Sequence, residues 1–313
     1  MMSAPNEPNL RDVPCPLCGG SRVKATLVDA STGRLDRAAL VACTSLDHGT
    51  FGRIVECAVC GIRFRSPRED DGTILRLYEG VEDAVYLENE RGRILTFTRA
   101  LRRLERLVPA RGPLLDVGCY TGVFLDIAAT HGWSVAGVEP SRWAAGLARR
   151  KGHRVHAGTL ESAALARKSF AVLTMWDTLE HYTDPVKELR HARELARDDG
   201  YLVLSTVNVD SWFVRLLGKR WPWYMRMHLS YFTPRTLARA LELAGWRLVH
   251  LHGYAHVVTW DYLLLKLGRS QPRVSGAIRS GLRRLGLSDA TIAVDLGDFV
   301  TAYAKKATGV GTP

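Results

Sequence analysis

The sequence predicts an α/β fold, in which a Rossmann-like, mostly parallel sheet of seven strands carries helices on both faces and follows a small N-terminal metal-binding module. Three observations support this prediction. From residue 114 onward, apolar strand-like runs alternate with helical patterns, and such alternation is typical of a parallel sheet covered by helices. The glycine loop "DVGCYTG" joins the first strand to its helix, and two Cys-x-x-Cys pairs lie within residues 1–70.

Composition narrows the class of protein. The chain has 313 residues, 46% of them hydrophobic, and a formal net charge of +11. These values suit a globular protein with a sizeable core and exclude general disorder or a fibre. A basic balance favours anionic partners. The N-terminus lacks a signal pattern, and no uncharged apolar run reaches the ~18 residues that span a bilayer. We therefore expect a soluble cytoplasmic protein with reduced cysteines.

The two Cys-x-x-Cys pairs predict a zinc ribbon. A tetrahedral zinc ion needs four soft ligands at about 2.3 Å, and two tight turns deliver them in pairs. A glycine follows the second cysteine of each pair, which suits a backbone that turns around a metal. Such a site is structural. Redox-active or free thiols are the alternative, and Cys43 or His48 could replace a ligand. The expected ligands are Cys15, Cys18, Cys57 and Cys60.

Periodicity then divides the chain. Residues 1–70 form the ribbon, residues 71–110 a helical lead-in with an apolar stripe over 94–107, and residues 111–313 the nucleotide-binding domain. Ser141, Asp184-Pro185 and Thr233-Pro234 mark helix starts in this domain. Its expected strands are 114–117, 134–139, 154–157, 170–176, 201–207, 247–253 and 299–304.

The glycine loop indicates a particular nucleotide. A dinucleotide site has the pattern G-x-G-x-x-G facing a pyrophosphate, whereas here Gly118 and Gly122 are spaced G-x-x-x-G and Asp116 precedes them. A carboxylate there repels a pyrophosphate and attracts a cation. S-adenosylmethionine carries an ammonium and a sulfonium and no phosphate. Glu139 ends the second strand, where an acid accepts hydrogen bonds from ribose hydroxyls. Alternatively, Asp116 satisfies a helix N-terminus and Glu139 is a solvated strand end.

Residues 114–122 and 134–141 resemble the first two motifs of class I S-adenosylmethionine-dependent methyltransferases. The stretches "MWDTLEHYTDPVKELRHARELARDDGYLVLSTVN" and "HLSYFTPRTLARALELAGW" are similar to the continuation in one large subgroup. Zinc-ribbon members of that subgroup also carry the two cysteine pairs, a Ser-Pro and tyrosines before the first motif. The resemblance covers roughly residues 15–250 and the last strand. It implies methyl transfer, and some relatives of this layout methylate nucleotide-linked deoxysugars.

The cofactor site expected from these motifs lies at the ends of four strands. Thr159 and Leu160 are expected to flank the adenine, and Trp176 and Asp177 to line the adenosine or methyl pocket. Tyr120 occupies a position that is glycine in the familiar motif, so its side chain must point away from the backbone. The full expected set is Asp116, Gly118, Cys119, Tyr120, Gly122, Glu139, Pro140, Thr159, Leu160, Trp176 and Asp177.

Two histidines are candidates for a catalytic general base. Methyl transfer to a hydroxyl gains from a base with a pKa near neutrality, which histidine provides. His228 comes first because it follows the fifth strand and matches the histidine that resembles the base in the sugar-modifying relatives, although Met227 stands where those relatives commonly have an acid. His181 comes second. A structural role, such as packing against aromatic rings, is the alternative for each.

Two basic segments suggest the acceptor. Residues 211–241 contain no acid and six basic residues among aromatic ones, and within them residues 211–232 form a basic aromatic cover. We expect a small anionic acceptor methylated mostly on oxygen: a sugar nucleotide, a phosphorylated glycan or a natural product. The insertion at 255–290 includes the acid-free stretch 262–288. It suits an anionic membrane, RNA phosphates or a solvated helix face.

Two other functions remain open at this stage. An RNA methyltransferase would use the ribbon and the basic segments to hold nucleic acid, but no Asn-Pro-Pro-type sequence follows the fourth strand, which reads Trp176-Asp177-Thr178-Leu179. A non-catalytic interaction protein would have no need for the intact Asp116 and Glu139. The sequence does not decide the oligomeric state.

Overall fold

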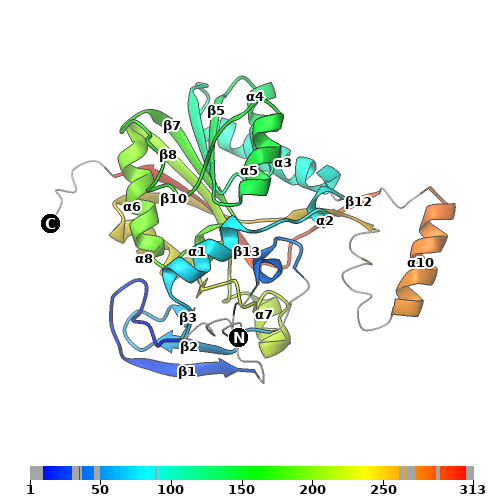
Figure 1. Ribbon diagram of the computed structural model, residues 1–313, viewed down its shortest axis with the longest axis horizontal. Helices are drawn as coiled ribbons and strands as arrows, with labels where there is room; N and C mark the ends of the chain where they lie inside the picture. The colour runs from blue at the N-terminus through cyan, green and yellow to red at the C-terminus, as the bar shows by residue number, and fades with distance from the viewer. Residues whose placement is uncertain are drawn as a thin grey trace, which may run out of the picture.

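The computed structural model describes residues 10–29, 35, 37–45, 50–88, 90–260, 264, 272–286 and 290–307. Its centre is a seven-stranded sheet with the order β6-β5-β4-β7-β8-β13-β10 (Figure 1). Adjacent strands from β6 to β8 are parallel, and β13 is antiparallel to both its neighbours. The predicted fold class is therefore confirmed. The strands are β4 (Pro113–Val117), β5 (Ser134–Glu139), β6 (Arg154–Ala157), β7 (Phe170–Trp176), β8 (Ala196–Val207), β10 (Trp246–Gly253) and β13 (Phe299–Lys306).

Helices cover both faces of this sheet because neighbouring strand residues point to opposite sides. Leu114 packs in one apolar cluster with Phe124, and the adjacent Leu115 packs in another with Leu189. The first face carries α3 (Glu90–Leu107), α4 (Val123–Thr130) and α5 (Arg142–Arg150), and the second carries α6 (Pro185–Leu195) and α8 (Pro234–Leu243) (Figure 1). The sheet is thus the middle layer of three.

The predicted helix starts are confirmed, and one strand start differs. The side chains of Ser141, Asp184 and Thr233 each accept a hydrogen bond from the backbone N–H three residues later, which caps α5, α6 and α8. The fifth parallel strand begins at Ala196 instead of residue 201, and α6 ends at Leu195. Residue 196 already pairs with β7, and the register then shifts before residue 201. A bulge of this kind leaves no periodic trace in the sequence.

The N-terminal segment contributes to a second sheet that includes a distant strand. This sheet has the order β1 (Val23–Val28), β2 (Arg53–Cys57), β3 (Arg63–Arg65), β9 (Ser230–Tyr231). The backbone N–H of Arg65 donates to the carbonyl of Leu229 at 2.9 Å, so β3 lies against the residues that follow His228. The predicted domain boundary at residue 70 stays a prediction, but this sheet joins strands from both sides of it by hydrogen bonds.

The remaining elements surround the carboxyl ends of the parallel strands. They are η1 (Ala38–Val41), α1 (Asp71–Glu79), α2 (Val85–Glu88), η2 (Leu179–His181), α7 (Trp212–Leu217), η3 (Gly218–Arg220), a hairpin of β11 (His256–Thr259) and β12 (Thr291–Val294), and α10 (Pro272–Arg284). Much of the predicted basic stretch 262–288 lies outside the described residues. Within the described part of the chain, no helix is long and apolar enough to cross a membrane.

A buried ion pair ties the N-terminal sheet to the loop before β9. Arg65 and Glu69 pair with side chains that are 1% and 0% exposed. The guanidinium of Arg65 also donates to the carbonyl oxygen of Arg226, and Glu69 accepts from the backbone N–H of Leu35. Because removing one partner leaves an uncompensated buried charge, such pairs are costly to break.

We therefore expect Glu69→Gln to lower the free energy of unfolding by about 3–5 kcal/mol. The matched control is Glu242→Gln, which breaks an exposed pair with Arg239 and should cost less than about 1 kcal/mol. Urea denaturation followed by circular dichroism measures both. Equal effects of the two substitutions would contradict the structural role given to the buried pair.

Candidate functional site

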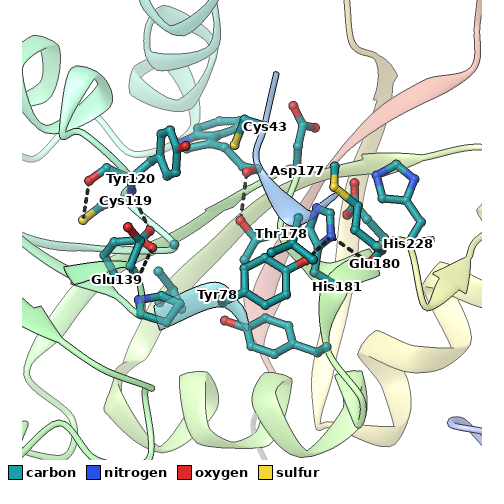
Figure 2. Close-up of a pocket in the computed structure, with 18 of the residues that line it drawn as sticks. Cys43, Tyr78, Cys119, Tyr120, Glu139, Asp177, Thr178, Glu180, His181 and His228 are labelled. Carbon is teal, nitrogen blue, oxygen red and sulfur yellow. Dashed lines mark hydrogen bonds between the residues drawn. The ribbon is translucent and has the colours of Figure 1, made fainter. Parts of the chain in front are cut away.

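A cavity of about 860 Å³ opens at the carboxyl ends of the parallel strands. Ligands of open α/β sheets bind at this edge. Its wall includes the ends of β4, β5 and β7, the lead-in helices α1 and α3, the loop before β9, and residues around β11 and β12. Figure 2 shows the part of the wall where Glu139 and Tyr120 face Asp177, His181 and His228 across the cavity.

The glycine loop passes very close to the loop after β7. Gly118 has a φ of +76°, and a Cβ there would lie 2.8 Å from the side chain of Thr178. Only glycine fits both requirements. Gly122 is not among the lining residues, so its expected contact with a cofactor stays a prediction. It precedes α4 with a φ of +79°, and its Cα faces Ala148, which a Cβ would approach to 3.0 Å. Its role is helix packing.

Asp116 sits at the base of the cavity with 2% of its surface exposed. The hydroxyl of Thr174 donates to its Oδ1 at 2.6 Å. Burial raises the pKa of Asp116 to about 8, with a further rise from the charge of Glu139, while the Thr174 hydrogen bond opposes the shift. A cationic ligand placed here would reverse this shift, because an opposite charge favours the ionised carboxyl.

Glu139 holds the loop in place. Its Oε2 accepts from the backbone N–H of Tyr120 at 2.9 Å, and its Oε1 accepts from the N–H of Ser141 at 2.8 Å. Burial raises the pKa of Glu139 to about 7 despite these two hydrogen bonds. Each carboxylate oxygen has a second lone pair, so a ligand hydroxyl can still donate to Glu139.

Tyr120 points away from its own loop toward the lead-in segment. Its φ is +46°, which is unusual for a residue other than glycine. The phenol donates to Oδ2 of Asp83 at 3.1 Å, and the ring packs edge-on against Tyr86 at 4.4 Å between centroids. Trp143 lies on another side at 6.2 Å. Tyr120 thus links the glycine loop to the segment that closes over the cavity.

The other expected cofactor residues are in or behind the wall. Pro140, Thr159 and Leu160 line the cavity. Cys119 also lines it, but its thiol packs inward, because a Cβ on Gly137 would come within 2.5 Å of the Cys119 sulfur. Burial raises the pKa of the Cys119 thiol well above its usual value.

Trp176 ends β7 and Asp177 follows it in the cavity wall. The Trp176 ring stacks on Tyr254 with 6.2 Å between centroids. Its Nε1 is buried and has no hydrogen-bond partner among the described residues. Asp177 has a φ of +49° and accepts from the hydroxyl of Ser205 at 2.6 Å. Burial raises its pKa.

The two candidate histidines lie side by side, and Glu180 is beside them. The imidazole centroids of His181 and His228 are 4.9 Å apart. His228 is buried, and its Nδ1 lies 2.8 Å from the carbonyl oxygen of Trp223. Nδ1 of His181 lies 2.9 Å from the phenol of Tyr78. Burial lowers the pKa of His181 to about 4.

Glu180 is 1% exposed and accepts from the hydroxyl of Thr206 at 2.8 Å. Burial and, to a smaller extent, the charge of Asp177 raise its pKa to about 8. The wall at this point therefore combines the imidazole of His181, whose pKa is lowered, with a carboxyl group that is costly to ionise without a cation nearby.

Sequence reasoning assigned no site role to several lining residues. The lining residues from the lead-in belong to no motif, although Tyr78 and Tyr86 are among the tyrosines that precede the first motif. The lining residues near β11 and β13 come from segments that the sequence pattern assigned to an insertion or to the end of a strand. Glu180 had a signal, since it directly precedes His181. The set is Tyr78, Arg93, Thr178, Glu180, Tyr254, His256 and Phe299.

The basic aromatic cover contributes aromatic side chains to the wall and keeps its basic ones outside it. Phe213 and Trp223 line the cavity, whereas none of the six basic residues of 211–241 is among the lining residues. Arg215 pairs with Asp210 at 2.6 Å. The basic side chains in the wall are Arg93 and Lys187, and Lys187 pairs with Glu161 at 2.7 Å.

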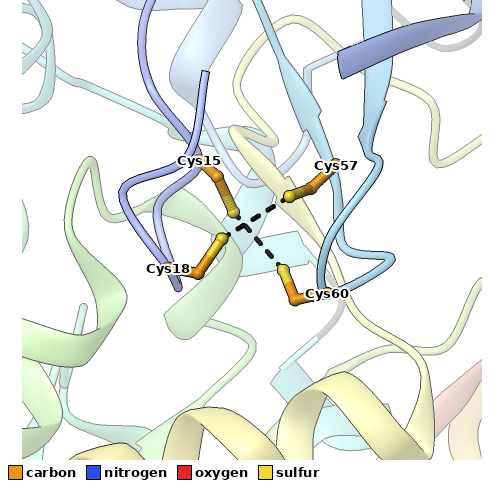
Figure 3. A group of neighbouring side chains, drawn as sticks. All are labelled: Cys15, Cys18, Cys57 and Cys60. Atoms are coloured by element: carbon orange, nitrogen blue, oxygen red, sulfur yellow. Dashed lines mark hydrogen bonds between the residues drawn. The ribbon is translucent and has the colours of Figure 1, made fainter. Parts of the chain in front are cut away.

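The four predicted zinc ligands gather at one end of the N-terminal sheet (Figure 3). The sulfurs of Cys15 and Cys60 are 3.4 Å apart and those of Cys18 and Cys57 3.6 Å. A tetrahedron with bonds of about 2.3 Å places its sulfurs ~3.8 Å apart, so the spacing suits a metal and is too long for a disulfide. Burial raises the pKa of Cys57, but backbone hydrogen bonds outweigh it and lower that pKa to about 7.

Comparisons with known proteins agree with this geometry. The family model of a methyltransferase domain matches residues 88–251, which is more than half of the chain. The ubiquinone biosynthesis O-methyltransferase of Aromatoleum aromaticum is 29% identical over 157 residues, covering 46% of this chain and 67% of that protein. The enzyme of the same name from Azorhizobium caulinodans is 30% identical over 168 residues, covering 50% of this chain and 64% of the relative.

Among solved structures, a chain of the Haloferax volcanii complex that contains the Trm112 methyltransferase activator matches with a TM-score of 0.50 and 12% identity. The match covers 73% of this chain and all of the other, and it concerns the fold alone. The sheet order, the acid-glycine loop at its carboxyl edge and the match of the family model lead to one conclusion: the chain belongs to the methyltransferase-domain family and is a class I S-adenosylmethionine-dependent methyltransferase.

Proposed function

We propose that the protein transfers the methyl group of S-adenosylmethionine to a hydroxyl oxygen of a small molecule that carries an apolar ring. One observation supports this most directly. A single cavity joins the acidic cofactor end, with Asp116 and Glu139, to an aromatic end bordered by His181 and His228. Methyl transfer requires acceptor, methyl and sulfur in line, and one continuous space allows that alignment.

In this proposal the acidic end holds the cofactor. Asp116 attracts the ammonium of the methionine portion, and Glu139 accepts from the ribose hydroxyls. Leu160 and Pro140 pack beside the adenine. When bound, S-adenosylmethionine supplies the activated methyl group, and the residues of this chain position it. The buried carboxyl groups support this assignment, because burial without a cation leaves them with raised pKa values.

The aromatic end is proposed to hold the acceptor. Trp176, Tyr254 and Phe299 line it, and Trp176 brings a buried N–H that can donate to an acceptor oxygen. The related ubiquinone biosynthesis enzymes are O-methyltransferases by name, which favours oxygen as the methylated atom. A natural product suits this wall better than a sugar nucleotide or a phosphorylated glycan, because a phosphate would need the basic side chains of the wall. Arg93 already lies over the ring of Tyr86, and Lys187 already pairs with Glu161.

Loss of the acceptor proton is proposed to depend on His228. Its Nδ1 faces a carbonyl oxygen, so a neutral ring carries its proton there and keeps a lone pair on Nε2. His181 supports the same wall, held near the phenol of Tyr78. These positions suit direct proton acceptance, as the sequence suggested.

The four cysteines are proposed to hold a structural zinc ion, because their sulfur spacing and reduced state fit a closed four-thiolate site. The cytoplasmic location, the alternative of RNA as a substrate and membrane contact through 262–288 stay predictions. For the last, the described helix α10 exposes Ile278 among basic residues, and much of the stretch lies outside the described residues.

Cofactor binding should release protons. Near pH 7 the Asp116 carboxyl is largely protonated, because its pKa is about 8, and the cationic cofactor favours the ionised form. Affinity should therefore rise with pH up to about 8 and then level off. Calorimetry in buffers of different ionisation enthalpy measures the protons released. Asp116→Asn should weaken binding about tenfold or more and remove most of the release, whereas pH-independent binding by the unchanged protein would contradict the assignment.

Substituting His228 should separate chemistry from cofactor binding. We expect His228→Gln to lower kcat at least 100-fold, the size of a typical general acid–base contribution, with little change in the Kd of S-adenosylmethionine. His250→Gln is the control, because His250 is exposed and is not among the lining residues. Methyl transfer from labelled cofactor to an extract of small molecules provides the assay. Unchanged turnover in His228→Gln would exclude this role.

Zinc should be bound in one equivalent and should stabilise the N-terminal sheet. Cys15→Ser is expected to lower both the zinc content and the melting temperature, because one thiolate of the closed site is lost. Cys43→Ser is the control, since Cys43 is not part of the cluster. Elemental analysis and thermal denaturation measure the two effects. A zinc-free wild-type protein of unchanged stability would overturn the proposal.

A further inference from the structure

Asp83 joins three segments of the chain at the cofactor end of the cavity. Its side chain is 5% exposed, and it lies just before helix α2 in the lead-in segment. Its Oδ2 accepts from the backbone N–H of Thr44 at 3.0 Å and from the phenol of Tyr120 at 3.1 Å. Its Oδ1 accepts from the hydroxyl of Thr44 and from the N–H of Tyr86, the latter at 3.2 Å. Asp83 itself is not among the lining residues, so it acts on a ligand through these neighbours.

Each of the three segments that Asp83 joins forms part of the cavity wall. Thr44 follows Cys43, which lines the cavity and belongs to the stretch between the two cysteine pairs. Tyr86 lies on α2 and Tyr120 in the glycine loop, and both line the cavity. Figure 2 shows Cys43 next to Tyr120. One buried carboxylate therefore holds together parts of the wall that come from the N-terminal module, the lead-in and the cofactor loop.

Tyr120 needs such an anchor because its backbone is strained. Its φ of +46° disfavours any residue with a Cβ. The same backbone carries the N–H that donates to Glu139 at 2.9 Å, so the strained conformation is the one that places the loop against the acid of the cofactor site. The contacts of the Tyr120 side chain, with Asp83 and with the ring of Tyr86, offset this strain.

The hydrogen bond between Tyr120 and Asp83 has a fixed direction. Burial raises the pKa of the Tyr120 phenol, so the phenol keeps its proton and donates. The four donors around Asp83 offset the cost of burying its carboxylate. Removing the phenol therefore weakens the support of the loop and also leaves one lone pair of a buried carboxylate unsatisfied.

We propose that Asp83 is a positioning residue for S-adenosylmethionine, which acts through Tyr120 by holding the glycine loop in the conformation that binds the cofactor. This proposal rests on the proposed place of the cofactor against Asp116 and Glu139. It concerns the affinity for the cofactor, and methyl transfer from the bound cofactor does not depend on it. Because Thr44 provides two of the four hydrogen bonds to Asp83, the stretch between the cysteine pairs becomes part of the cofactor site.

Tyr120→Phe tests the hydrogen bond by itself, because it removes only the phenol oxygen. Calorimetry with S-adenosylhomocysteine should show a Kd about tenfold higher, the size expected for a hydrogen bond to a charged group. Asp83→Asn should weaken binding to a similar extent, and combining the two substitutions should add little, since both remove the same contact. Tyr201→Phe is the control and should leave the Kd unchanged, because Tyr201 lies on β8 and is not among the lining residues.

Tyr120→Gly separates positioning from a general effect on stability. Glycine adopts a positive φ without strain, so in this variant Asp83→Asn should change the Kd by less than about twofold. The kinetic test uses labelled cofactor and the same extract of small molecules as for His228. Tyr120→Phe should raise the KM for S-adenosylmethionine about tenfold and leave kcat within about twofold of the wild-type value.

Tyr120→Phe protein that binds S-adenosylhomocysteine as tightly as the wild type overturns the inference. An effect of Asp83→Asn that is equally large with and without Tyr120→Gly overturns it as well, because Asp83 would then only support the fold. Failure of the proposed function looks different. A wrong acceptor leaves these Kd values as expected, whereas a wrong place for the cofactor leaves the Kd unchanged in Asp116→Asn.

Discussion

The burial of three carboxyl groups at one edge of the sheet is the constraint on which this site depends. Asp116, Glu139 and Glu180 follow or end neighbouring parallel strands, and each is at most 5% exposed. No ion pair among the described residues includes them, and burial raises the pKa of each to between about 7 and 8. Such groups destabilise an empty site when ionised, so they favour cationic ligands. A sulfonium cofactor fits this requirement.

The N-terminal module takes part in the same site. Strand β3 pairs with β9, directly after His228, and Arg65 reaches the loop before it. The proposed zinc ion would be bound by the turn before β1 and the turn after β2 of this sheet. Its effect on methyl transfer would therefore be mechanical: it would fix the sheet on which the His228 loop rests. The lead-in segment closes another side through Tyr120 and Asp83.

Much of the central sheet and of the cofactor end of the site could be predicted from the sequence, because local patterns encode them. Alternating apolar runs predicted where the parallel strands lie along the chain, and the caps at Ser141 and Thr233 predicted the helix starts. The cofactor motif placed Asp116 and Glu139 correctly in the wall. The cofactor role of Gly122 stays a prediction, because the same positive φ serves helix packing as well as ligand approach. The anionic acceptor stays a prediction, since a count of charges does not say which way side chains point.

The pairing of β3 with β9 and the meeting of His181 with His228 join residues far apart in the chain, which no local pattern encodes. The account as a whole is tested most directly by a crystal structure of the complex with S-adenosylhomocysteine. It predicts the ligand ammonium in contact with Asp116, the ribose hydroxyls on Glu139, and the sulfur directed toward the space between Trp176 and His228. A ligand bound elsewhere, or one whose ammonium lies away from Asp116 with that carboxyl still unpaired, would contradict it.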